Sequence, residues 1–380
     1  MKKHYLLRFL AVLFGFTLMA AACGEDNDET QDSIDAPDDT SSGGTGTTSE
    51  DVVEVTQDES LLTTIQARGE LVCGVSGAAV AFSETQSDGS QIGFDADYCR
   101  AVAAAILGDA EAVKFVALTA AERFTAVQTG AVDLLMRNTT WTQSRDSEIG
   151  MDFGPTTYYD GQQFMGRAGD GFSAKSDVAD LAGLTICTNS GTTTEKNVAD
   201  AADAAGVSVT LGGPFEDFDQ VTQAFQDGTC DVITTDGSAL VGRKAVNEPN
   251  DWVIFPATPI SKEPLGPTYR QNDSKFADVV NWTVYATIIA DEYDVTMANV
   301  DSKASAGADG VAEVVRLLGG EGELQTGMGL AADAFYQVIK QVGNYDEIYA
   351  RNLNPVGLTR EGSANAGWLD GGLIYAPPAR

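Results

Sequence analysis

The hydrophobic pattern from residue 60 to residue 136 alternates between short apolar runs and longer stretches with helical spacing. A short apolar run bounded by polar residues or glycine is typical of a buried strand, whereas apolar residues three and four apart are typical of a helix. The expected strands are residues 71–75, 114–118 and 132–136, and the expected helices are 61–66, 93–107 and 122–128. Strands that alternate with helices predict an α/β fold with a parallel sheet.

A similar pattern recurs 98 residues later. Residues 124–135 and residues 222–233 each contain a helix tail, a glycine, two further residues, an aspartate and a buried strand. Because ligands of open α/β sheets bind beyond the carboxyl ends of strands, we expect two α/β lobes whose polar strand ends face each other. A chance match of a common turn is the alternative. The polar residues are Asn138, Thr140 and Arg145 after the first strand, and Thr234, Thr235 and Asp236 after the second.

Arg145 follows a cluster of hydroxyl side chains at the end of the first of these strands. A guanidinium can bind a carboxylate with two parallel hydrogen bonds, and neighbouring hydroxyls can satisfy the remaining lone pairs. This combination favours an anionic ligand. The alternative is an exposed arginine that pairs with Asp146 or Glu148.

The second half of the chain adds a possible anion site. A strand at residues 184–188 is followed by Asn189-Ser190-Gly191-Thr192-Thr193-Thr194-Glu195 and an alanine-rich helix. Gly191 permits a tight turn, and a threonine followed by Glu195 is a capping-box pattern. The free N–H groups of a helix start can bind an anion, although a well-capped helix without a ligand has the same pattern.

Together these residues match the charges of an α-amino acid, which carries a carboxylate beside an ammonium group. Arg145, Thr140 and the helix start at residues 191–195 suit the carboxylate, and Asp236 suits the ammonium. If the two lobes supply opposite charges, a bound zwitterion bridges them and favours the closed form.

The composition excludes several classes of function. The 380 residues are 43% hydrophobic, as in a globular protein, and their number suits about two domains. The formal charge of −33 argues against a nucleic-acid partner, because phosphate binding requires a basic surface.

The N-terminus has the order of a secretory signal. Lys2, Lys3 and Arg8 precede an apolar stretch at residues 9–19, and three alanines precede Cys23. We therefore expect residues 1–22 to be a lipoprotein signal peptide and Cys23 to be lipidated. An ordinary signal peptide with a chance cysteine is the alternative.

Residues 23–59 are expected to form an acidic flexible linker. They contain thirteen acidic residues, no basic residue and a Ser/Gly/Thr-rich tract at residues 40–49. No other apolar run is as long as that of the signal, so we expect a membrane-anchored protein that does not span the membrane. Without residues 1–22, twenty basic residues stand against fifty-six acidic ones, which gives a charge of −36.

Histidine and cysteine usage narrows the chemistry further. The only histidine is His4, within the predicted signal, so histidine-based catalytic triads and metal sites are excluded, and we expect no metal or other cofactor. Cys73, Cys99, Cys187 and Cys230 form an even set in an exported chain, which favours disulfides. Three pairings are possible. We favour Cys73–Cys99 and Cys187–Cys230, because each stays within one expected lobe; buried free thiols are the alternative.

The chain resembles the bacterial extracellular solute-binding proteins of the polar amino-acid class, and within it the general L-amino-acid-binding branch that serves ABC-type importers. The resemblance extends from about Leu62 to Arg380. The motifs that carry it are Gly93–Arg100, Arg137–Thr142 with Ser144–Asp146, Tyr158–Gln162, Gly191–Glu195, Cys230–Asp231 with Thr234–Asp236, Ser261–Pro267 and Gly371–Pro377.

This resemblance implies a two-lobed fold of the periplasmic-binding-protein type II, which closes like a Venus flytrap. Two crossover strands, near residues 159–166 and 256–262, would form the hinge. Lobe 1 would comprise residues 60–162 plus 258–380, and lobe 2 residues 163–257.

The resemblance also implies roles for individual residues. Arg145 would bind the ligand carboxylate with Thr140 and the backbone around Thr193, and Asp236 would accept the ligand ammonium. Ser76 stands where many relatives have an acidic residue and an aromatic cover, so a broad range of amino acids is expected. The expected ligand-binding residues are Arg145, Thr140, Asp236, Thr193, Thr192, Asn138 and Ser76.

The expected function is an amino-acid-binding lipoprotein that delivers its ligand to an ABC-type permease. It would be a monomer in the periplasm or on the cell surface. The alternatives are a dehydratase-type or peptidoglycan-active enzyme on the same scaffold, with Asp236 or Glu195 as the acid, and an amino-acid sensor.

Overall fold

The computed structural model describes residues 60–320 and 324–380. The predicted signal peptide (1–22), the predicted lipidation site at Cys23 and the predicted acidic linker (23–59) lie outside these residues. None of the helices within the described ranges combines the length and the apolar character that crossing a membrane requires.

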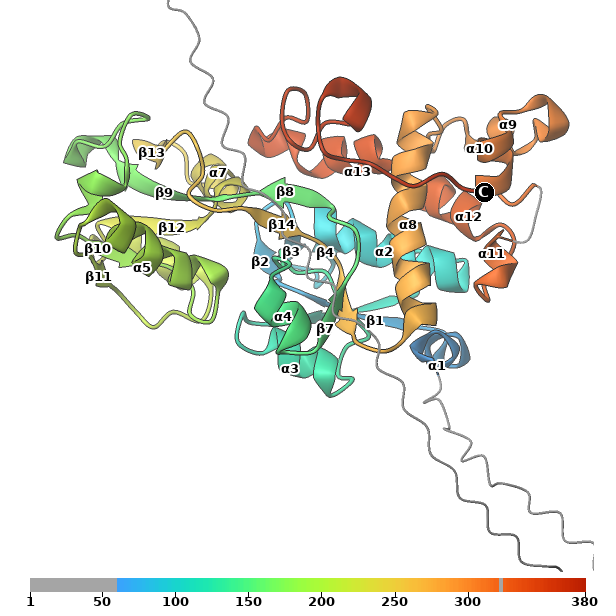
Figure 1. The fold of residues 1–380 in the computed structure, drawn as a ribbon, viewed down its shortest axis with the longest axis horizontal. Coiled ribbons are helices and arrows are strands. Elements are labelled where there is room, and N and C mark those ends of the chain that lie inside the picture. The colour runs from blue at the N-terminus through green and yellow to red at the C-terminus, as the bar shows by residue number, and fades with distance from the viewer. Residues whose placement is uncertain (1–59, 321–323) are drawn as a thin grey trace, which may run out of the picture. The chain divides into compact units, whose positions relative to one another are not determined.

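Two five-stranded sheets form the framework of the fold, and we call each sheet with its helices a lobe (Figure 1). The first lobe has the strand order β5-β1-β6-β15-β7 and the second has β11-β10-β12-β9-β13. The first sheet consists of β1 (Leu71–Val75), β5 (Val113–Ala117), β6 (Leu134–Leu135), β7 (Met151–Phe153) and β15 (Thr268–Arg270). The second consists of β9 (Gln162–Arg167), β10 (Thr185–Cys187), β11 (Thr210–Leu211), β12 (Val232–Asp236) and β13 (Trp252–Phe255).

The remaining strands form two smaller sheets. The chain passes from the first sheet to the second and back, and each passage contains one strand of an antiparallel pair, β8 (Tyr158–Asp160) with β14 (Glu263–Leu265). Near the start of the chain, β2 (Ala78–Ala79), β3 (Ser83–Thr85) and β4 (Gln91–Ile92) form a three-stranded antiparallel sheet.

The expectation of parallel sheets is correct for only part of each sheet. Strand β1 is parallel to β5 and β6, and β10 is parallel to β11 and β12. Strands β9 and β15 pair antiparallel with their neighbours, because each enters its sheet directly from a passage between the lobes and not from a helical crossover. Both sheets are therefore mixed.

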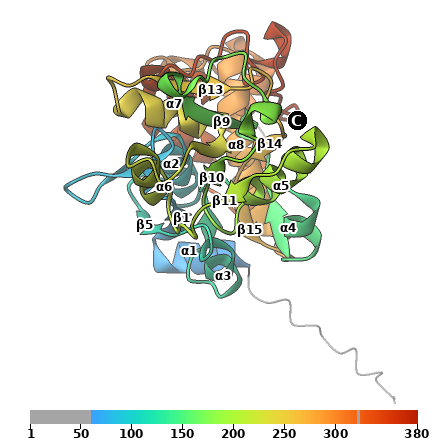
Figure 2. The same ribbon diagram turned by 90° about the vertical axis from the view of Figure 1, so that its left-hand side faces the viewer.

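Helices cover the sheets, and from α8 onward the chain contains helices and no further strand of the sheets (Figures 1 and 2). Helices α8, α12 and α13 pack against α2 in the first lobe. Figure 2 views the molecule from the side of the second lobe, where α5 lies beside β10. The helices are α1 (Leu61–Arg68), α2 (Phe94–Leu107), α3 (Arg123–Gln128), α4 (Gln143–Ser147), α5 (Thr193–Ala205), α6 (Phe218–Gln226), α7 (Gly237–Val246), α8 (Ser274–Glu292), α9 (Val300–Ala304), α10 (Ala312–Leu317), α11 (Leu324–Gly327), α12 (Ala334–Gln341) and α13 (Tyr345–Asn352).

The repeated Gly-x-x-Asp pattern has the same structural role in both lobes. The carboxylate of Asp133, just before β6, accepts a hydrogen bond of 2.8 Å from the N–H of Val72 in β1. The carboxylate of Asp231, just before β12, accepts one of 2.8 Å from the N–H of Thr185 in β10. Each aspartate thus fastens its strand to the neighbouring parallel strand, and both strands end beside the cavity described below.

Each lobe contains one disulfide bond. Cys73 in β1 is joined to Cys99 in α2, and Cys187 in β10 is joined to Cys230 before β12. These are the two pairs favoured by the sequence, and all four cysteines are buried.

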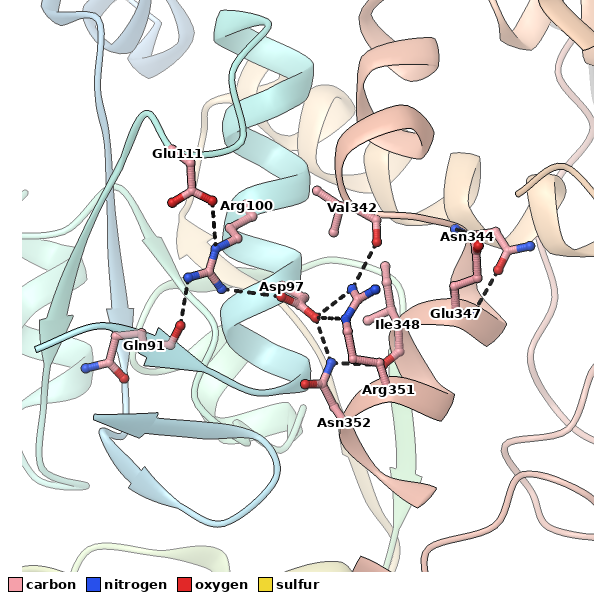
Figure 3. Close-up of polar contacts among 10 residues, drawn as sticks. All are labelled: Gln91, Asp97, Arg100, Glu111, Val342, Asn344, Glu347, Ile348, Arg351 and Asn352. Atoms are coloured by element: carbon pink, nitrogen blue, oxygen red, sulfur yellow. Dashed lines mark hydrogen bonds and ion pairs between the residues drawn. The ribbon is translucent and has the colours of Figure 1, made fainter. Parts of the chain in front are cut away.

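Two buried carboxylates in the first turn of α2 link this helix to the rest of the first lobe. Asp97 accepts hydrogen bonds from Arg351 Nη2 at 2.7 Å and Nε at 2.9 Å, and from Asn352 Nδ2 at 2.7 Å. Figure 3 shows Asp97 between these α13 side chains and Arg100 of its own helix. Asp97 therefore ties the C-terminal helices to the central helix of the lobe.

Asp95 links the same helix turn to the segment that follows β6. Its Oδ2 accepts a hydrogen bond of 2.9 Å from the backbone N–H of Asn138, which follows β6. Burial raises the pKa of Asp95 to about 7, although the Asn138 N–H and the Arg137 charge oppose this shift. The helix thus fixes the backbone beyond the strand end.

Replacing Asp97 with alanine should lower the free energy of unfolding by about 2–3 kcal/mol, because Arg351 loses its anion and Arg100 keeps only the exposed Glu111. This loss of stability is smaller than that for a fully buried ion pair. The Arg351 side chain is 40% exposed, so water can hydrate it once Asp97 is removed. Denaturant unfolding measures the change. Asp200→Ala, on the exposed side of α5, is the control and should change stability by less than about 0.5 kcal/mol. Equal effects of the two substitutions would contradict the role of Asp97.

Replacing Asp95 with asparagine should change how stability depends on pH. Because folding raises the pKa of Asp95, the contribution of this side chain to the free energy of unfolding is complete below pH 4. That contribution is lost as the pH rises toward 7, by at most about 1.4 kcal/mol per pH unit. Asparagine keeps the acceptor for Asn138 but cannot ionise. The stability of the variant relative to the natural protein should therefore increase from pH 5 to pH 7 in denaturant unfolding; a constant difference would be the contrary result.

Candidate ligand-binding site

The strand ends of both lobes surround one cavity of about 370 Å³. The first lobe contributes the loop around Ser76–Val80 and the segments that follow β5 and β6. The second contributes the start of α5, the start of α6 and the end of β12. This position beyond the carboxyl ends of strands is the usual ligand site of α/β folds.

All the residues that the sequence singled out for ligand binding line this cavity. They come from both lobes, and the structure brings the two oppositely charged ones to the same space. The seven residues are Ser76, Asn138, Thr140 and Arg145 of the first lobe and Thr192, Thr193 and Asp236 of the second.

Arg145 is held in place by its own short helix. Thr142 caps α4 by accepting a hydrogen bond of 3.3 Å from the Arg145 N–H, and Arg145 Nη1 donates to the carbonyl of Thr140 at 2.8 Å. The side chain lies over the ring of Phe124, with 5.2 Å between the guanidinium carbon and the ring centroid. Burial lowers the pKa of Arg145, and the negative charges of Glu263 and Asp236 oppose that shift. Arg145 is thus a buried cation that lines the cavity and has hydrogen-bond donors left for a ligand.

Asp236 supplies the opposite charge from the second lobe. It stands at the end of β12 and precedes α7, yet its side chain does not cap that helix. Burial and the nearby charges of Asp160 and Glu263 raise its pKa well above the usual value, whereas Arg145 and Arg123 oppose the rise. The carboxylate is therefore destabilised by its surroundings and would be stabilised by a cationic ligand group.

The two further carboxylates belong to the passages between the lobes. Asp160 in β8 accepts hydrogen bonds from Ser238 and from the N–H of Gly161, and burial raises its pKa to about 6. Glu263 in β14 accepts hydrogen bonds from Ser261 at 2.6 Å, Asn197 at 2.9 Å and Thr193 at 3.0 Å. Both carboxylates already have hydrogen-bond partners, whereas the side chain of Asp236 has none among the described residues.

The start of α5 lines the cavity, but its capping differs from the expected box. Thr192 Oγ1 accepts a hydrogen bond of 3.1 Å from the Glu195 N–H, as a cap should. The Glu195 carboxylate accepts its bond from the N–H of Gly191, at 2.8 Å, and not from the N–H of the capping residue. The first N–H groups of a helix lack an intrahelical acceptor, so those of Thr193 and Thr194 remain for a ligand.

Asn138 and Ser76 complete the first-lobe side of the cavity. Asn138 has a left-handed backbone with φ of 41°, and its buried Oδ1 has no hydrogen-bond partner among the described residues. The loop that begins at Ser76 carries only small side chains as far as Ala79. A buried acceptor without a partner costs free energy, so Asn138 suits a ligand N–H group.

Three arginines that line the cavity were missed by the sequence analysis: Arg123, Arg137 and Arg243. Arg243 of α7 donates to the carbonyl of Ala78 in the first lobe at 2.6 Å and pairs with Asp219, so it connects the lobes beside the cavity. A signal for Arg123 was present in the sequence. A positive charge in the first turn of a helix interacts unfavourably with the helix dipole. The arginine at the start of α3 therefore does not stabilise the helix, which indicates that it has another role.

Within residues 60–320 and 324–380, no group of three or more histidine, cysteine, aspartate or glutamate side chains could hold a metal ion.

Comparison with known proteins gives consistent matches over most of the chain. The family model of bacterial extracellular solute-binding proteins, family 3, matches residues 71–299. The chain is 44% identical to the general L-amino-acid-binding periplasmic protein of Rhizobium johnstonii, over 84% of this chain and 92% of that protein. It is 43% identical to the glutamate/glutamine/aspartate/asparagine-binding protein of Rhodobacter capsulatus, over 84% of this chain and 94% of that protein.

A solved structure extends the match to three dimensions. A periplasmic binding protein of an ABC transporter from Brucella ovis, with glutathione bound, is 43% identical and has a TM-score of 0.80. The match covers 85% of this chain and 100% of that one. The protein therefore belongs to family 3 of the bacterial extracellular solute-binding proteins and has their two-lobed, periplasmic-binding-protein-like α/β fold.

Proposed function

We propose that the protein binds L-amino acids in the cavity between its lobes and delivers them to an ABC-type permease. The observation that carries this proposal is the placement of Arg145 and Asp236, from different lobes, at one cavity. The amino-acid-binding relatives described above support the same ligand class. A zwitterion would neutralise both side chains at once, which a ligand with a single charge cannot do.

In this proposal each side chain has a defined partner on the ligand. Arg145 binds the α-carboxylate through a bidentate pair, assisted by Thr140 and by the N–H groups at the start of α5 with Thr192 and Thr193. Asp236 accepts the α-ammonium, and Asn138 offers its unpaired Oδ1 to a further ligand N–H. Ser76 lies in the loop of small residues that leaves room for the ligand side chain.

The ligand would be retained by closure of the lobes. We propose residues 60–162 plus 258–380 as lobe 1 and residues 163–257 as lobe 2, with β8 and β14 in the hinge. Closure is favoured only by contacts that exist in the closed form. The zwitterion provides such contacts, and the hydrogen bond from Arg243 to Ala78 adds a direct one.

We propose binding without catalysis. A raised pKa such as that of Asp236 is also a feature of catalytic acids. The pKa of Asp236 is raised by burial and by the neighbouring carboxylates, and a ligand ammonium group would counteract this rise by stabilising the ionised form. The relatives described above are named as binding proteins, which supports the same reading.

The location follows from the N-terminal sequence and from the family. We propose a monomer that acts outside the cytoplasm, held at the membrane by a lipid on Cys23 and separated from it by the acidic linker at residues 23–59. The periplasmic relatives support the extracytoplasmic location.

Replacing Arg145 with alanine should weaken amino-acid binding by about 2–5 kcal/mol, because one partner of a buried charge pair is lost. Calorimetry with the twenty amino acids and the folded natural protein identifies the ligands and gives the reference affinity. Arg270→Ala, which removes an exposed arginine of the same lobe, is the matched control. Unchanged affinity in Arg145→Ala would show that the carboxylate binds elsewhere, and no heat with any amino acid would refute the proposed function.

Replacing Cys23 with serine should release the protein from the membrane, because serine cannot carry the lipid. Detergent phase partitioning of expressed full-length protein measures the change, and Ser41→Ala in the linker should leave partitioning as it is. Equal partitioning of Cys23→Ser and the natural protein would indicate an ordinary signal peptide.

A further inference from the structure

The last part of the chain lies outside the region that the family model matches, yet it reaches one of the passages between the lobes. The match ends at residue 299, and residues 300–380 contain helices α9 to α13 and the C-terminal loops. Helix α13 and the loop around Asn365 both bond to the passage that contains β8 (Figure 1). Because β8 belongs to the proposed hinge, these bonds can influence how the lobes move.

The side chain of Asn365 binds the free edge of β8. Its Oδ1 accepts a hydrogen bond of 2.7 Å from the Tyr159 N–H, and its Nδ2 donates to the Tyr159 carbonyl at 3.1 Å. On the other edge of β8, Tyr159 stands opposite Pro264 of β14, which has no N–H group and whose carbonyl accepts from the Trp141 N–H. Asn365 therefore takes the place of a neighbouring strand for one residue of the hinge.

Asn365 is itself held in place by the first lobe. It is buried, its N–H donates to Ser363 Oγ at 3.1 Å, and its carbonyl accepts from Arg360 Nε at 3.1 Å. Arg360 in turn pairs with Asp291 of α8 at 2.5 Å and lies over the Tyr345 ring of α13, with 4.7 Å between the guanidinium carbon and the ring centroid. The bonds to Tyr159 are thus anchored in two helices of the lobe.

The residues just before Tyr159 are also fixed to the C-terminal helices. The Tyr345 hydroxyl donates to the carbonyl of Thr157 at 2.9 Å, just before β8. The ring of Tyr158 is stacked with that of Tyr349, with 6.2 Å between the centroids and 17° between the planes. Residues 157–159 therefore move with the first lobe.

The two residues that follow bind the second lobe instead. The Asp160 carboxylate accepts a hydrogen bond from the Ser238 hydroxyl, and the Gly161 carbonyl accepts one of 2.8 Å from the Gly237 N–H. Gly237 and Ser238 open α7 of the second lobe. The partners of the chain thus change lobes between Tyr159 and Asp160, so the passage must bend there when the lobes separate.

We propose that Asn365 is a positioning residue that fixes β8 to the first lobe and thereby favours the closed, ligand-bound form. This inference rests on the proposed function, because it concerns the closure that retains the ligand. In the closed form α7 and the bound ligand restrain the chain after Tyr159, so loss of the Asn365 bonds frees chiefly the open form. A larger set of open conformations lowers the fraction of closed protein and weakens ligand binding.

Stopped-flow fluorescence and calorimetry with L-glutamate and L-glutamine, or with two other amino acids that bind the natural protein, test this assignment. Asn365→Ala and Asn365→Leu both remove the two bonds to Tyr159, and leucine retains the branched shape of the side chain. In both variants dissociation should become about 5-fold faster or more, and the affinity should weaken by the same factor, because one residue regains backbone freedom. The factor should be equal for the two amino acids, since Asn365 is not among the described residues that line the cavity.

Asn352→Ala is the matched control, because it removes hydrogen bonds of similar length from the same C-terminal part without touching β8. The Asn352 amide donates to Asp97 at 2.7 Å and to the Ile348 carbonyl at 2.9 Å. This variant should melt at a lower temperature than the natural protein and release both amino acids at the natural rate. A loss of stability alone therefore does not produce the effect expected for Asn365.

Unchanged dissociation rates in the folded Asn365 variants would overturn the inference, and so would an equal acceleration in Asn352→Ala. A change for only one of the two amino acids would also overturn it, since Asn365 would then act on the cavity itself. In each of these cases the proposed function would stand. If the folded natural protein bound no amino acid, both would fall.

Discussion

The site depends on keeping two opposite charges largely buried beside one cavity. Arg145 and Asp236 are 6% and 8% exposed, and neither is neutralised by a direct ion pair in the described residues. A largely buried charge raises the free energy of the protein when it has no partner, and it attracts an opposite charge strongly. A zwitterion that fits between the lobes supplies both partners, whereas water supplies neither fully. The ligand-free protein is therefore destabilised by these unpaired charges, and a bound zwitterion would remove this destabilisation.

Much of the fold serves to hold these charges where they oppose each other. Asp133 and Asp231 fasten the strands that end beside the cavity, and Asp95 fixes the backbone of Asn138 just past one of them. The passages between the lobes carry Asp160 and Glu263, which bond to Ser238 and Thr193 of the second lobe. The same two carboxylates raise the pKa of Asp236. The passages between the lobes thus also influence the electrostatics of the site.

The sequence predicted the features that local patterns determine. The strands, the main helices and the residues at the strand ends follow from hydrophobic spacing and turn residues, and the likeness of the two halves reflects one repeated contact between an aspartate and a neighbouring strand. The antiparallel strands β9 and β15 could not be predicted in this way, because their direction depends on the route of the chain between the lobes. The partners of Asp97, more than 250 positions away, are likewise invisible to local patterns.

The same limit explains why Arg243 was missed, because it stands in an ordinary helical segment and only the fold brings it to the cavity. Arg145 was recognisable because hydroxyl residues surround it in sequence. Arg123 was missed although its place in the first turn of a helix was a local signal. Four arginines line the cavity together with four carboxylates, those of Glu122, Asp217, Asp219 and Asp236. The lining is therefore balanced in charge, although the whole chain has a formal charge of −33.

The central claim is that Asp236 recognises the ligand ammonium across the gap from Arg145. The most direct measurement compares the affinities of L-glutamate and glutarate, which lacks the ammonium group, for the natural protein and for Asp236→Asn. The account predicts that the natural protein prefers L-glutamate by at least about tenfold and that the variant largely loses this preference. An undiminished preference in Asp236→Asn would contradict it.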